Sequence, residues 1–138
     1  MVDFNFVEAN TPDFDPRVYI QILLAIAKAD KNNGPPEFEF VQRQARLLGV
    51  DYESCYQTTD KDFLLTARKV SRLTAMVILK DAIALASLDG NFSLPEKQRI
   101  YQYAEKLDAT RSDVDGLVDL MADYYRLIEK WRKIVRAR

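Results

Sequence analysis

The sequence predicts an all-α protein, a compact bundle of about five to seven helices built from two pseudo-repeated helix-turn-helix hairpins. Apolar residues recur with the 3.6-residue period of a helix in several segments, and capping residues stand at the ends of those segments. No stretch alternates between apolar and polar residues for long enough to predict a strand. A segment at about 17–50 is also repeated at about 73–109.

The repeat aligns without a gap when Asp30 is placed on Asp89, an offset of 59 residues. The turn that follows each of these aspartates then matches at a Pro-Glu pair, which makes a chance likeness of two amphipathic helices the weaker explanation. We interpret the pattern as an ancient duplication of a helical hairpin. The eight identities are Ala25/Ala84, Ala27/Ala86, Asp30/Asp89, Asn32/Asn91, Pro36/Pro95, Glu37/Glu96, Ala45/Ala104 and Leu48/Leu107.

The first half should contain two long helices. One is predicted from Arg17 to Ala29, with Asp15 as its N-cap and Pro16 at the first helical position. It is apolar almost all round and should therefore be buried. The next is predicted to begin near Pro35 and to end before Gly49, a residue suited to the position after a helix.

The connection between the halves is predicted to hold a short helix or loop at Tyr52–Thr58 and a helix at Asp62–Val70. A second buried helix should follow at Leu73–Leu88. The alanines shared by the two buried helices would let their backbones approach closely near a pseudo-two-fold axis. The remaining predicted helices are Leu94–Leu107, with Ser93 and Glu96 as a capping box, and Ser112–Val135.

Composition limits the function classes. The chain has 138 residues, which predicts a single domain over 1–138, with residues 1–15 as an acidic arm that holds four acids and no base. Twenty basic and 21 acidic residues argue against a nucleic-acid binder. One cysteine and no histidine exclude an internal disulfide, a His-dependent nucleophile and the usual zinc sites. The start lacks the features of a signal peptide and no apolar run reaches a membrane span, so we expect a cytoplasmic, soluble protein.

Two acidic turns carry the candidate site. Asp30 and Glu37 belong to the first turn, and Asp89, Asn91 and Glu96 belong to the second. The simplest interpretation is structural, because an Asp after a helix can form an Asx-turn and a Glu at the third helical position can cap the next helix.

The alternative is a divalent cation site made of carboxylate, amide and hydroxyl oxygens, which would suit calcium, magnesium or manganese. The spacing is not that of an EF-hand, since Glu96 falls at position 8 of the loop and Ile100 occupies position 12. A site could still form if Asp30, Glu37, Asp89 and Glu96 converge from the two halves.

The segments "ALASLDGNFSLPE" and "AIAKADKNNGPPE" resemble the TerB family of tellurite-resistance proteins, whose fold also occurs as a central domain in DnaJ-like co-chaperones. The resemblance covers about 17–135. It implies a compact helical fold, a cytoplasmic location and cation binding by Asp30, Glu37, Asp89 and Glu96. The first half departs from the family pattern, because Lys31 stands where the glycine is expected.

These observations favour a non-enzymatic TerB-like binding or scaffold module in a tellurite or general stress response. The competing hypothesis is a divalent-cation sensor that uses the two acidic turns. The partners of the chain are expected to be other proteins, and homo-oligomer formation is also possible. The basic C-terminal end, with six basic residues and one acid from Arg126 to Arg138, suits the helix dipole, and an anionic partner or membrane surface is the alternative.

Overall fold

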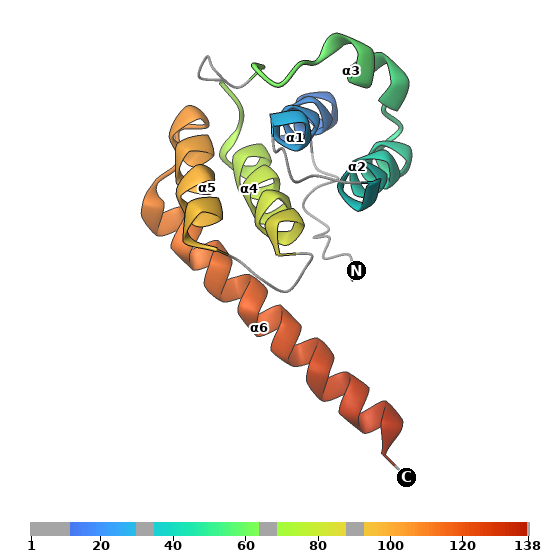
Figure 1. Cartoon of the computed structure of the whole chain (residues 1–138), viewed down its shortest axis with the longest axis vertical. Helices are drawn as coiled ribbons and strands as arrows, with labels where there is room; N and C mark the ends of the chain where they lie inside the picture. The colour runs from blue at the N-terminus through green and yellow to red at the C-terminus, as the bar shows by residue number, and fades with distance from the viewer. Residues whose placement is uncertain (1–11, 30–34, 64–68, 88–92, 138) are drawn as a thin grey trace.

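The computed structural model describes residues 12–29, 35–63, 69–87 and 93–137, and within these ranges it contains helices and no strands. The all-α prediction is confirmed, and the number of helices in these ranges lies within the expected five to seven. Figure 1 shows their arrangement. The helices are α1 (Pro16–Ala29), α2 (Pro35–Leu48), α3 (Tyr52–Thr58), α4 (Arg72–Ala86), α5 (Leu94–Lys106) and α6 (Arg111–Arg136).

Helices α1 and α4 pack against each other at the centre of the bundle (Figure 1). Helices α2 and α3 pack on α1, and helices α5 and α6 pack on α4. The two central helices are the two that the sequence predicts to be buried, and most of their residues are buried. Each half of the chain therefore wraps one buried helix with two partners.

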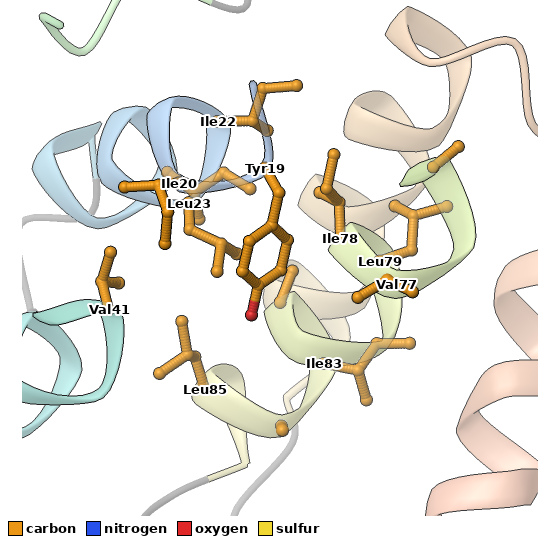
Figure 2. Packing of buried hydrophobic residues seen from close by; sticks show 14 of the residues in the cluster. Tyr19, Ile20, Ile22, Leu23, Val41, Val77, Ile78, Leu79, Ile83 and Leu85 are labelled. Carbon is orange, nitrogen blue, oxygen red and sulfur yellow. The ribbon is translucent and has the colours of Figure 1, made fainter. Parts of the chain in front are cut away.

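The hydrophobic core lies where these two groups of helices meet. Figure 2 shows side chains from α1, α2 and α4 interlocking there. Fully buried side chains include Ile20, Leu23 and Leu24 of α1 and Ile78 and Leu79 of α4. Helices α5 and α6 complete the core with Ile100, Ala104, Val114 and Met121.

Helices α2 and α5 end in the same way. Gly49 and Asp108 both have left-handed backbones, with φ of 71° and 59°. In each case the next residue closes the helix, since the Val50 amide donates to the Ala45 carbonyl over 2.8 Å and the Ala109 amide donates to the Ala104 carbonyl over 2.8 Å. This is the hydrogen-bond pattern of a Schellman motif.

The similarity continues into the third helix of each half. Asp51 caps α3 by accepting from the Ser54 amide, and Thr110, 59 residues later, caps α6 by accepting from the Asp113 amide. The two halves are also joined at the α1–α4 contact, where the Asp15 amide donates to Oγ1 of Thr74, 59 residues later, over 3.0 Å. These observations extend the suspected repeat from two helices to three.

The segment before α4 differs from the sequence prediction. A helix was predicted at Asp62–Val70, but residues 61–63 form a turn and residues 69–71 are not helical, while residues 64–68 lie outside the described residues. Asp60 accepts a hydrogen bond from the Asp62 amide, an Asx-turn that competes with a helix. Ser71 then starts α4 from an extended backbone, with its side chain accepting from the Thr74 amide.

Candidate functional site

The acidic turns are only partly described. Asp30, Asp89 and Asn91, three of the five predicted cation ligands, lie outside the described residues. Glu37 lies in the first turn of α2 and Glu96 lies in the first turn of α5, as the sequence predicts. Both glutamates therefore stand at helix N-termini, where a negative charge is favourable.

Glu96 has a structural role in this arrangement. Its Oε1 accepts a hydrogen bond from Ser93 Oγ at 2.8 Å and another from the Ser93 amide at 3.2 Å. The Glu96 amide donates to Ser93 Oγ over 3.3 Å, which completes the predicted capping box. These bonds use one carboxylate oxygen to hold the start of α5.

Glu37 and Glu96 are not carried by neighbouring helices. Helix α2 packs on α1 and helix α5 packs on α4, on opposite sides of the central pair (Figure 1). Among the residues that the structure describes, no group of three or more acidic or cysteine side chains is placed to hold a metal ion. The convergence of Asp30, Glu37, Asp89 and Glu96 thus stays a prediction. Of these four residues, the structure describes only the two glutamates.

A buried polar cluster lies instead between α1, α2 and α4. The Tyr19 hydroxyl donates to Asp81 Oδ2 over 2.5 Å and accepts from Gln44 Nε2 at 3.0 Å. Lys80 Nζ lies 3.1 Å from Asp81 Oδ1, and both side chains of this ion pair are almost completely buried. Figure 2 shows the Tyr19 ring pointing from α1 into the space between Val41 and the α4 side chains.

This buried cluster is not among the sites predicted from the sequence. Its signal is the pair Lys80-Asp81 inside "AMVILKDAIALA", where two charges interrupt an otherwise apolar helix. A buried charge requires a partner, so this interruption predicts an internal ion pair. The cluster joins three helices by directional bonds, and it fixes their relative positions more narrowly than apolar packing alone would.

The C-terminal part of α6 holds four of the nine exposed large hydrophobic residues of the described chain. Helix α6 starts against α4 and α5, where Val114 and Met121 are buried, and then extends beyond the other helices (Figure 1). We call residues 126–136 the α6 arm. In the arm, the exposed fraction is 62% for Leu127, 61% for Trp131 and 68% for Ile134.

The apolar residues of the arm lie on one side of the helix. Leu127, Trp131, Ile134 and Val135 follow the spacing i, i+4, i+7, i+8, which marks one helical face. Leu127 follows Val114, which is buried in the core, by 13 residues, and at about 100° per residue the two lie about 140° apart around the helix axis. The exposed apolar face of the arm is therefore a different face from the one that buries Val114 and Met121 in the first half of α6.

The arm also carries most of the basic residues at this end of the chain. It holds five basic residues and a single acid, Glu129. Arg132 pairs with Glu129 at 3.1 Å, and Arg126 pairs with Asp123, the residue three before it. In the part of the chain that the structure describes, the arm's other three cations, Lys130, Lys133 and Arg136, make no ion pair.

Comparison of the chain with protein-family models, with curated proteins and with solved structures gave no match. The TerB-like resemblance therefore stays a prediction that depends on the two acidic turns and on the repeat. No helix in the described ranges is both long enough and apolar enough to cross a membrane.

Proposed function

We propose that the chain is a non-enzymatic helical binding or scaffold module of the TerB-like type, which acts in the cytoplasm and contacts its partner through the α6 arm. The observation that carries the proposal is the exposed apolar face at Leu127, Trp131 and Ile134. Large contiguous apolar surfaces on a folded chain usually mark interaction sites. A role in a tellurite or general stress response follows from the family resemblance alone.

The chemistry of the described side chains supports binding over catalysis. The chain has no histidine to act as a general base near neutral pH. Its single cysteine, Cys55, is buried in the core, and burial raises the pKa of the thiol. A thiol of raised pKa is protonated at neutral pH and is a poor nucleophile.

A nitroxide spin label at position 134 tests the proposal. Cys55 is buried, so Ile134→Cys gives one accessible thiol on the arm, and Leu47→Cys, at a residue that is 71% exposed on α2, gives a matched control. The labelled chains are mixed separately with the soluble and the membrane fraction of lysed cells. We expect the spectrum of the label at 134, and not at 47, to show immobilisation by one of the fractions. Equal mobility at both positions in both fractions would refute an arm-mediated contact.

The divalent-cation sensor is the competing hypothesis from the sequence. In the described residues, the Glu96 carboxylate caps α5 through the Ser93 amide and hydroxyl. That arrangement supports the structural interpretation of the second turn.

A further inference from the structure

The charges of the α6 arm flank its apolar face on both sides. Successive helical residues are rotated by about 100°. On this basis Lys130 lies beside one edge of the stripe formed by Leu127, Trp131 and Val135, and Arg132 lies beside the other edge. The arm is thus an amphipathic helix with an exposed apolar face and cations along both borders.

We propose that the α6 arm docks on an anionic lipid bilayer, lying in the plane of the headgroups with Trp131 directed toward the acyl chains. This inference rests on the proposed function and names its partner. Helices that bind at membrane interfaces combine a Lys/Arg-rich polar face with Trp and Leu on the opposite face. The charge of the arm is complementary to anionic headgroups, each basic residue near such a surface adding to the attraction.

The long basic side chains match this geometry. Lys130 and Lys133 make no ion pair within the described part of the chain. A lipid phosphate can therefore pair with their ammonium groups without displacing a carboxylate. Lysine and arginine can also extend along an apolar surface while their charged ends stay in the headgroup layer. The arm has 11 residues and is about 16 Å long, about half of the hydrocarbon thickness, so it can lie on a bilayer and cannot cross it.

The same charges disfavour a second copy of the chain as the occupant. Two arms packed face to face would place two segments together that each hold five basic residues and one acid. Like charges at such a distance repel each other, and the repulsion grows as the apolar faces exclude water. An anionic surface attracts the basic residues of the arm, whereas a second arm would repel them.

Trp131 is the single tryptophan of the chain, so it reports the environment of the arm directly. We would record its emission in the full-length protein with vesicles of phosphatidylcholine alone and with vesicles that also contain phosphatidylglycerol. We expect a shift to shorter wavelength with the anionic vesicles, reversed by high salt because the Debye length falls to about 3 Å at 1 M. A shift of the same size with neutral vesicles, or no shift with either, would overturn the proposal.

A dilution series without lipid separates the membrane from a second copy. If Trp131 is covered by another chain, its emission will shift to shorter wavelength as protein concentration rises, and sedimentation will show a dimer. That result would replace the bilayer by self-association. We expect emission independent of concentration and a monomer.

Variants then assign the binding to the arm. Leu127→Ser and Ile134→Ser should each weaken partitioning into anionic vesicles about tenfold, as loss of one buried aliphatic side chain does. Leu47→Ser, at an equally exposed leucine of α2, should leave it unchanged. Lys130→Glu and Lys133→Glu should each weaken it at least about fivefold, while Arg46→Glu on α2 should not. All six positions are exposed, and circular dichroism checks that each variant stays folded.

Equal effects of the arm variants and of the α2 controls would overturn the assignment to the arm. The spin label at position 134 separates this failure from failure of the proposed function. Immobilisation by the soluble fraction only, together with unchanged Trp131 emission on vesicles, would keep the binding module and reject the bilayer.

Discussion

The Tyr19 hydroxyl donates a 2.5 Å hydrogen bond to the Asp81 carboxylate in the interior of the bundle, and this bond ties α1 to α4. The same carboxylate holds the buried Lys80 ammonium at 3.1 Å. One side chain therefore compensates both a buried hydroxyl and a buried cation. Removal of the Asp81 carboxylate should therefore leave both the Tyr19 hydroxyl and the Lys80 ammonium without this partner.

Asp81→Ala should lower the free energy of unfolding by about 3–5 kcal/mol, because it removes a carboxylate that pairs with the buried Lys80 ammonium. Tyr19→Phe keeps the ring and should lose less, about 1–3 kcal/mol. Replacing the pair together, by Lys80→Met with Asp81→Leu, should recover most of the loss from Asp81→Ala. Urea unfolding measures all three variants. A larger loss in Tyr19→Phe than in Asp81→Ala would contradict this account of the cluster.

The matched helix ends of α2 and α5 make a second prediction. Gly49→Ala should destabilise the protein by about 1–2 kcal/mol, because a side chain disfavours the left-handed backbone there even though nothing lies within 4 Å to clash with it. Asp108→Gly should change the stability by less than about 0.5 kcal/mol, since relief of the backbone opposes the greater freedom of the unfolded chain. Thermal unfolding of both variants checks the difference. If Gly49→Ala were neutral, the φ of 71° at that position would not be required.

Asp113 should make the stability of the folded protein depend on pH in the acid range. Its side chain accepts from Arg72 at 2.9 Å and from the Thr110 amide at 3.0 Å. The bond from Arg72, with that from Thr110, lowers the pKa of the Asp113 carboxyl from 3.8 to about 2. The carboxylate is thus favoured in the folded state, so its contribution to stability is complete above about pH 4 and is lost as the pH falls toward about 2.

Carboxyl chemical shifts measured by NMR through an acid titration test this prediction. In Arg72→Gln the pKa of Asp113 should rise toward 3.8, because the principal cause of its depression has been removed. Asp113→Asn keeps an oxygen for the Thr110 amide, and it should flatten the dependence of the melting temperature between pH 4 and pH 2. An unchanged pKa of Asp113 in Arg72→Gln would exclude the guanidinium as the cause.

The acidic turns are tested by melting the protein with calcium, magnesium or manganese and with a chelator. We expect no ion-dependent shift at millimolar metal, because Glu96 caps α5 through Ser93. Glu96→Gln should then lower the melting temperature equally with metal and with chelator. A cation site would stabilise the protein by about 2.7 kcal/mol at a hundredfold excess over Kd. A saturable shift of that kind, lost in Asp89→Asn, would establish the sensor instead.

The helices could be predicted from the sequence because their boundaries are local. Pro16, Gly49 and Ser93 act within one turn of the chain, and the structure begins or ends a helix beside each of them. The Asp62–Val70 prediction was wrong in its described part, since the Asp60 side chain competes for the backbone there. The spacing of apolar residues does not show that a side chain competes for the backbone hydrogen bonds of a helix.

The buried polar cluster could not be predicted in the same way. Tyr19 and Asp81 are 62 residues apart, and their bond depends on how α1 crosses α4. The sequence does show that Lys80 and Asp81 interrupt an apolar helix, but it does not show which groups face them. For the acidic turns, the structure adds the cap at Glu96 and describes none of Asp30, Asp89 and Asn91.

The contact between Asp15 and Thr74 bears on the history of the chain. The two residues are 59 positions apart, which is the offset of the repeat, although Asp15 precedes α1 and Thr74 lies inside α4. If the halves arose by gene duplication, this contact would have been intermolecular in any ancestor in which the two copies were separate chains. The third helix now has seven residues in one half and 26 in the other, so any covering partner that α3 has in the bundle leaves the end of α6 without an equivalent.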